Sequence, residues 1–368
     1  MKNIKKSERI IVMILMLTGV IFLSFYATSC TDTYSRNNSV VDAYELRMDG
    51  KADSAVVLLS KVILDEPDNA MAYYELARTK THLMLGGGKY QIGEIIENSS
   101  KACELDPDNL AYAFFDANTK FLDVYIDLMR GKEGISDKLD ISLAAFKKAL
   151  AIDSCNTSML ITVTEINSML PPEYGGSREE AIKYAGLTAD CNQIEGLKAY
   201  AFTLPADGNL LNYWLEIYDT YDANATILEE LGRAYLLEGE LEKGRQYIEE
   251  AIAMDAEKSI LYIDLGRAYM MNAMENQNHD TGAEAIRMYQ RYISSNPDAT
   301  NPMKAYLYRM IAVTGKRITG NEELANNFMK KQEETDPFCS RAFGAPSPNL
   351  FIPPDEIPTA SAYYSRPF

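Results

Sequence analysis

The chain has 368 residues, of which 47% are hydrophobic and 24% are charged, a composition that excludes both a disordered chain and a membrane protein with many spans. A single hydrophobic core rarely grows past about 250–300 residues, so this length predicts two domains or an elongated array. The formal net charge of −17 argues against nucleic acid as a partner, because phosphate backbones repel an acidic body.

The N-terminus has the composition of an export signal. Lys2 to Arg9 form a basic head, an uncharged apolar run extends from Ile10 to Ala27, and the small residues Ala-Thr-Ser precede Cys30. Cys30 in this context resembles a bacterial lipobox, although Ala27 stands where that motif usually has Leu. We expect residues 1–29 to be removed, Cys30 to carry a lipid, and residues 30–39 to form a polar tether. An uncleaved spanning anchor is the alternative, since the run is long enough to cross a bilayer.

Two similar segments, EPDNAMAYYELA and DPDNLAYAFFDA, begin at residues 66 and 106 and indicate an internal repeat. The clearest unit covers residues 225–258. Small and apolar residues recur in it at the spacing of one helical face, on a first helix and then on a second: Leu228, Leu231, Gly232 and Tyr235, followed by Gly244, Ile248 and Ala251. Small residues allow the two helices to approach closely, which predicts a helical hairpin.

This pattern resembles the tetratricopeptide repeat (TPR), and partial matches recur through residues 40–337. In TPR proteins the hairpins stack into a superhelix with a continuous groove. We therefore expect an all-α, TPR-like solenoid over 40–337, irregular at 194–224, where a helix pair is centred on Trp214. Residues 338–368 hold many prolines and predict an extended tail, either loose or laid across the last repeat by Phe343, Phe351, Tyr363 and Tyr364.

The TPR resemblance also implies which residues line the concave groove, because one stripe of each first helix faces it. The ninth repeat position holds Arg78, Asn118, Arg233 and Arg267, and Tyr74 lies one turn before Arg78. A guanidinium group presents a planar fork that suits a carboxylate. The arginines therefore either bind a carboxylate of a peptide partner or pair with a carboxylate of a neighbouring repeat.

The string LPPEYGGSREEA, residues 170–181, is explained by helix punctuation, with Pro171 and Pro172 ending one helix and Ser177 and Glu180 forming a capping box on the next. It also resembles the turn of TRAP-transporter T-component lipoproteins. That resemblance implies a transport-accessory role, with a ligand pocket near Tyr174, Trp214 and Tyr218.

No pattern of catalytic or metal-binding residues emerges from the sequence. His82 and His279 lack partners at zinc-ligand spacing and are expected on the surface. The run at residues 86–89, GGGK, lacks the Ser or Thr of a phosphate loop and predicts a turn between helices. We expect no enzyme activity and no cofactor.

Four cysteines remain after Cys30, and only Cys155 and Cys191 fall at comparable places in consecutive units. Stacked helices lie about 8–10 Å apart, whereas a disulfide needs Cα atoms within about 7 Å. The spacing therefore does not favour a disulfide between them, and the sequence leaves the pairing of Cys103 and Cys339 open.

The sequence predicts a membrane-anchored, extracytoplasmic scaffold that binds a protein or peptide partner in its concave groove. Its expected location is the bacterial cell envelope, periplasm-facing or surface-exposed, at the outer membrane. Two alternatives stay open: association with a transporter subunit or small solute, as in the T-components, and glycan binding as a cap on an outer-membrane import barrel.

Overall fold

The computed structural model describes residues 38–88, 90–205, 207–341 and 350–355. These residues form helices, turns and irregular segments, without a strand among them, which confirms the all-α prediction. The expected signal, Cys30 and most of the tether lie outside the described residues, as do Phe343, Tyr363 and Tyr364. Within the described ranges, every helix is too short or too polar to cross a membrane.

Consecutive helices pair as antiparallel hairpins, as a TPR-like solenoid requires. Helical residues 38–48 precede α2 (Ala52–Asp65). The hairpins that follow are α3 (Ala70–Leu85) with α4 (Ile92–Leu105), α5 (Leu110–Met129) with α6 (Ile135–Ile152), α7 (Thr157–Met169) with α8 (Arg178–Cys191), α11 (Ala225–Leu237) with α12 (Leu241–Met254), α13 (Leu261–Asn276) with α14 (His279–Ser295), and α15 (Asn301–Arg317) with α16 (Glu322–Thr335). A short 3₁₀ helix, η2 (Ala256–Ile260), links α12 to α13.

The predicted repeat register is confirmed by the contact between α11 and α12. A Cβ atom added to Gly232 would lie 2.7 Å from Cγ1 of Ile248 and 2.9 Å from the carbonyl oxygen of Gly244. Both glycines, Ile248 and Ala251 are buried. The two helices thus touch through backbone atoms, which is the reason why this face must carry residues without a bulky side chain.

Three of the turns between units share one device, in which an asparagine caps the first helix of the next hairpin. The side chains of Asn69, Asn109 and Asn156 each accept a hydrogen bond from a backbone N–H three residues on. Each amide also donates to the acidic residue three positions earlier. Such a cap contributes about 1 kcal/mol to helix stability, so these turns fix where the hairpins begin.

Residues 194–224 are irregular, as predicted, but they do not form a helix pair. α9 (Gln193–Phe202) packs on α7 and α8, whereas α10 (Leu210–Thr220) packs on α11. Trp214 is completely buried in the cluster that includes Ala201 of α9 and Leu231 of α11. The indole group therefore fills the space between α9, which packs on the preceding hairpin, and α11, which begins the next one.

The punctuation predicted for residues 170–181 is present with one difference. α7 ends at Met169, the 3₁₀ helix η1 (Pro172–Tyr174) follows, and Ser177 caps α8 by accepting from the N–H of Glu180. In a capping box the Glu180 carboxylate would accept a hydrogen bond from the Ser177 N–H. Here that N–H donates to the carbonyl oxygen of Asn167 instead. The Glu180 carboxylate instead pairs with Lys183.

Cys155 and Cys191 form a disulfide, with Cα atoms 5.5 Å apart, so the expectation from helix spacing was wrong. Cys155 lies in the turn between α6 and α7, and Cys191 is the last residue of α8. Turns and helix ends can approach more closely than two helix axes can, and the axis spacing was therefore the wrong measure. Cys103 and Cys339 are free thiols.

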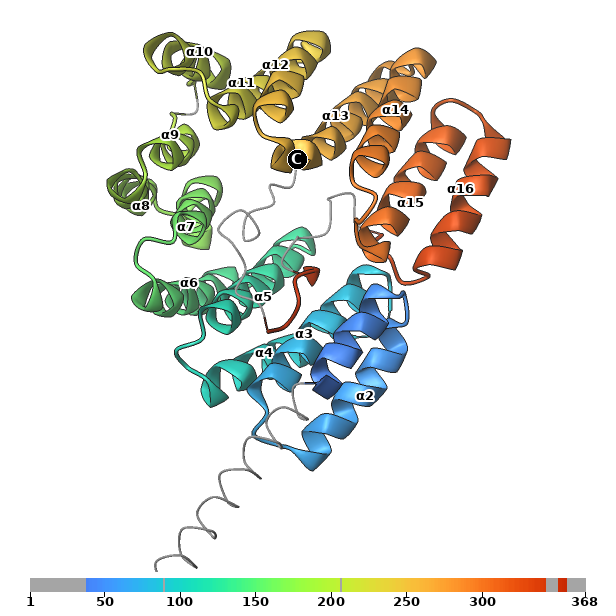
Figure 1. The fold of residues 1–368 in the computed structure, drawn as a ribbon. Coiled ribbons are helices and arrows are strands. Elements are labelled where there is room, and N and C mark those ends of the chain that lie inside the picture. Colours follow the sequence, from blue (N-terminus) through green and yellow to red (C-terminus); the bar gives the residue numbers. More distant parts are fainter. Residues whose placement is uncertain (1–37, 89, 206, 342–349, 356–368) are drawn as a thin grey trace, which may run out of the picture.

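The array curves until its two ends meet, with the end of α16 and the residues after it next to the first turn and the end of α3 (Figure 1). A Cβ atom on Gly50, whose φ is +76°, would lie 2.5 Å from the carbonyl oxygen of Thr335, so the first turn touches the end of α16. Residues 336–341 continue this contact, and the N–H of Arg341 donates to the carbonyl oxygen of Leu85 over 2.8 Å. The described hairpins thus form a closed ring.

Candidate functional site

A short segment of the chain, residues 350–355, lies inside this ring beside α3 and α5 (Figure 1). Its main chain is held by side chains from the first hairpins at three successive carbonyl oxygens. The Tyr44 hydroxyl donates to the carbonyl oxygen of Phe351 over 2.5 Å, and Arg47 and Arg78 donate to those of Leu350 and Ile352. The predicted tail lies differently from the expectation: residues 350–355 have bends and a turn, and they contact the first repeats as well as, through Phe351, the cluster of the last hairpins.

The two arginines are held in position by one carboxylate, that of Glu75. The Nε and Nη2 atoms of Arg47 lie 2.8 and 2.7 Å from Oε1 of Glu75, and Nη1 of Arg78 lies 3.3 Å from Oε2. All three side chains are 0% exposed. Burial lowers the pKa of Arg47, while Glu75 opposes that shift by stabilising the charged form.

Helix periodicity explains how these groups reach one place. Tyr44 and Arg47 are three residues apart on the helical segment 38–48, and Tyr74 and Arg78 are four apart on α3, so each pair lies on one helical face. The guanidinium carbon of Arg78 lies 4.9 Å from the centre of the Tyr74 ring. Burial raises the pKa of Tyr74.

An apolar pocket next to the arginines takes the side chain of Leu350, which is 3% exposed. Leu350 belongs to a buried cluster with Tyr74 from α3 and Tyr112 and Phe115 from α5. The Tyr74 ring lies 4.7 Å from that of Tyr112 and 5.5 Å from that of Phe115, measured between centroids. The site thus combines donors for a peptide main chain with a socket for one aliphatic side chain.

The other predicted groove residues lie elsewhere and have partners within the chain. Nη2 of Arg233 is 2.6 Å from Oδ2 of Asp264, and Nη1 of Arg267 is 3.8 Å from Oδ1 of the same residue. Asp264 therefore joins the arginines of two consecutive hairpins. The amide of Asn118 donates to the carbonyl oxygen of Phe114, one turn back on its own helix.

The residues of the alternative ligand pocket are divided between two places. Trp214 is completely buried and Tyr218 packs against the same cluster. Tyr174 lies on η1, which contacts α6, and its side chain is exposed. The indole group of Trp214 is therefore part of a filled core.

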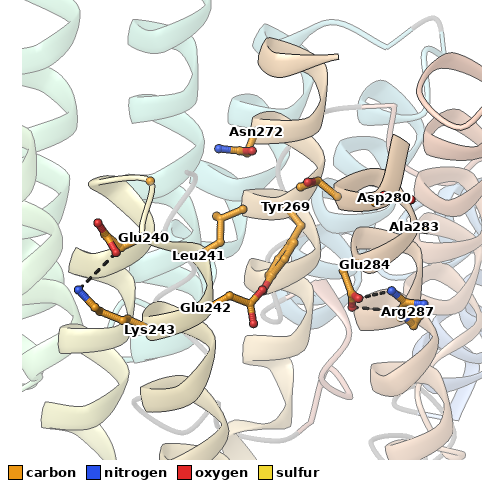
Figure 2. Close-up of a pocket in the computed structure, with 12 residues that line it drawn as sticks. Glu240, Leu241, Glu242, Lys243, Tyr269, Asn272, Asp280, Ala283, Glu284 and Arg287 are labelled. Carbon is orange, nitrogen blue, oxygen red and sulfur yellow. Dashed lines mark hydrogen bonds and ion pairs between the residues drawn. The ribbon is translucent and has the colours of Figure 1, made fainter. Parts of the chain in front are cut away.

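A separate pocket of about 730 Å³ lies where α12, α13 and α14 meet (Figure 2). The Tyr269 hydroxyl donates to Oε1 of Glu242 over 2.7 Å. Lys243 pairs with Glu240, and Arg287 pairs with Glu284. These charged side chains are therefore paired with each other within the wall of the pocket. Across the described ranges, no group of three or more His, Cys, Asp or Glu side chains is arranged to hold a metal ion.

Sequence reasoning missed most of the peptide contacts and misplaced one histidine. Tyr44, Arg47 and Glu75 were not singled out. His82 was expected on the surface, but its imidazole is 4% exposed and lies 2.9 Å from a carboxylate oxygen of Asp336. The contacts of Tyr44 and Arg47 with the segment and of His82 with Asp336 join residues hundreds of positions apart, and a repeat pattern carries information only about neighbouring units. His279 is exposed, as predicted.

Neither models of protein families nor curated proteins match this sequence. Among solved structures, it is similar to a TPR protein of Thermus thermophilus at 18% identity, over 63% of this chain and 98% of that one, with a TM-score of 0.35. A TPR protein of Parabacteroides merdae is similar at 13% identity, over 81% of this chain and 99% of that one, with a TM-score of 0.42. A TPR-containing protein of Cytophaga hutchinsonii is similar at 11% identity, over 81% of this chain and 95% of that one, with a TM-score of 0.29. The assignment as a TPR-like solenoid therefore depends on the helix pairing within this chain.

Proposed function

We propose that the protein is a non-catalytic scaffold, anchored outside the cytoplasm by a lipid on Cys30, that holds a protein partner through a peptide segment on its inner surface. The observation that carries this proposal is the grip on residues 350–352. Three successive main-chain carbonyl oxygens are bound by Tyr44, Arg47 and Arg78. A surface that binds main-chain atoms can accept segments from other proteins as well as its own.

The scaffold role is preferred to the transport-accessory role because the pocket expected for a small solute contains a buried core residue, Trp214. The charge distribution gives no support to nucleic acid as a partner, since the whole chain carries a formal net charge of −17.

Photo-crosslinking in intact cells tests the proposal. A photoreactive amino acid at Asn118, on the predicted inner stripe, should capture a defined protein. The same group at Val57, which is 72% exposed on α2, is the matched control and should not capture it. Both variants should be recovered in the membrane fraction. Identical products at the two positions, or none at Asn118, would contradict a scaffold with an inner binding surface.

A further inference from the structure

The peptide site recognises its occupant mainly through main-chain atoms. Each of the carbonyl oxygens of Leu350, Phe351 and Ile352 accepts a hydrogen bond from a different side chain, and two of the three donors are guanidinium groups. Hydrogen bonds from charged donors are about twice as strong as neutral ones. A segment must therefore turn its carbonyl groups toward these donors, as residues 350–352 do with a 3₁₀ residue followed by two bends, but its sequence is restricted only where side chains enter pockets.

The requirement of the arginines for a carboxylate is met inside the protein. Glu75 pairs with both guanidinium groups through its two oxygens, and one further nitrogen of each group donates to the neutral carbonyl group of Leu350 or Ile352. The donors that reach Leu350 and Ile352 bind internal carbonyl groups of the segment, so the arrangement suits the interior of a peptide chain.

Side chains add selectivity at two positions. Leu350 fills the apolar socket between α3 and α5, and Phe351 packs against both that cluster and the cluster of the C-terminal hairpins. Pro353 and Pro354 follow directly. Proline favours an extended conformation and has no N–H group to satisfy, so a segment of this kind loses little entropy when it binds.

The segment is also tethered close to its site. Arg341 is fixed to Leu85 by a main-chain hydrogen bond, and only residues 342–349 separate it from Leu350. A short tether gives an effective concentration on the order of millimolar. Any segment from another protein must compete with this local concentration.

We propose that the inner site binds neutral peptides of the class aliphatic–aromatic–aliphatic–proline through internal main-chain carbonyl groups, and that residues 350–353 are its built-in competitor. This inference rests on the proposed function and assigns both its ligand class and its regulation. A partner segment then gains access only when it displaces the chain's own segment.

The test uses the full-length chain and a fluorescein-labelled, C-terminally amidated peptide with the sequence LFIPPD of residues 350–355, followed by fluorescence anisotropy. Leu350→Asp should release the internal segment, because a carboxylate does not fit the apolar socket. We expect this variant to bind the peptide at least 10-fold more tightly than the wild type, as a tether near millimolar concentration implies for a peptide with a Kd of about 100 µM. Leu64→Asp, at a position 82% exposed, is the control and should behave as wild type.

Tyr44→Phe, added to Leu350→Asp, removes one donor with little change in shape and should weaken binding about 5–10-fold while circular dichroism and melting temperature stay the same. A folded Leu350→Asp variant that does not bind the peptide overturns the site. Equal binding by wild type and Leu350→Asp overturns the internal competition. Stronger binding of LFI with a free carboxylate than of its amide overturns recognition through internal carbonyl groups. Each of these results leaves the scaffold proposal intact, because only the crosslinking at Asn118 tests that.

Discussion

Substitution of Gly232 tests whether the contact between paired helices depends on the missing side chain. In Gly232→Ala the new methyl group would lie 2.7 Å from Cγ1 of Ile248, 2.9 Å from the carbonyl oxygen of Gly244 and 3.1 Å from the backbone nitrogen of Ile248. Two of these three neighbours are backbone atoms, so α11 and α12 must move apart. Overpacking of this kind costs about 1–3 kcal/mol.

A gain in helix propensity opposes that cost, because alanine is about 1 kcal/mol more favourable than glycine inside a helix. The net expectation for Gly232→Ala is a loss of roughly 0–2 kcal/mol in the free energy of unfolding, and Gly232→Leu should lose at least about 2 kcal/mol because three more carbon atoms enter the contact. Gly186, inside α8, is a matched control. A Cβ there meets only the Tyr200 hydroxyl, at 3.5 Å, so Gly186→Ala should stabilise the protein by up to about 1 kcal/mol.

The measurement is equilibrium unfolding in urea, followed by circular dichroism and by hydrogen exchange of the α11 and α12 amides. From the most to the least stable protein, the expected order is Gly186→Ala, wild type, Gly232→Ala and Gly232→Leu. If Gly232→Ala stabilises the protein as much as Gly186→Ala does, the close approach of the two helices does not set the residue type, and the reasoning on repeat register fails.

Three further predictions concern covalent and charged groups. Mature protein should begin at Cys30 with added acyl chains, and Cys30→Ser should block membrane attachment; a purified form that keeps residues 1–29 would refute lipidation. Cys191→Ser opens the disulfide with Cys155 and should cost about 4 kcal/mol by chain entropy for a separation of 36 residues, so equal urea midpoints for oxidised wild type and variant would refute its role. Burial raises the pKa of Glu229, but Arg233 and two lysines hold it at about 2 against an ordinary 4.5; the stabilisation is present above pH 4.5 and is lost as pH falls toward 2. Glu229→Gln should therefore cost at most about 3 kcal/mol at pH 7 and flatten the acid dependence of stability between these pH values, whereas parallel acid titrations would contradict this.

The sequence was sufficient to predict the helices, their pairing and the small residues at their contacts, because each of these features repeats within about 34–40 residues. Gly232, Gly244 and Ala251 were placed correctly on this ground. Of the candidate site, only Tyr74 and Arg78 were predicted, since they fall on a stripe of α3 that any TPR-like helix presents to the groove.

The rest of the site depends on contacts between distant parts of the chain. Arg47 and Glu75 have the composition of a solvated helix face, yet both are buried, and Arg47 donates to a carbonyl oxygen 303 residues away. His82 became buried for the same reason, through Asp336. The disulfide depended on where two helix ends converge, a quantity that helix spacing does not determine.

The meeting of α16 with the first turn changes how the array responds to stress. In an open solenoid each unit is stabilised by its neighbours, so the two terminal units have one neighbour fewer and open first. Here Gly50, His82 and Leu85 give the first units a second neighbour in residues 335–341. The terminal units can therefore unfold only after their contacts with each other break. The backbone amides of α2 and α16 should then exchange as slowly as those of the central hairpins.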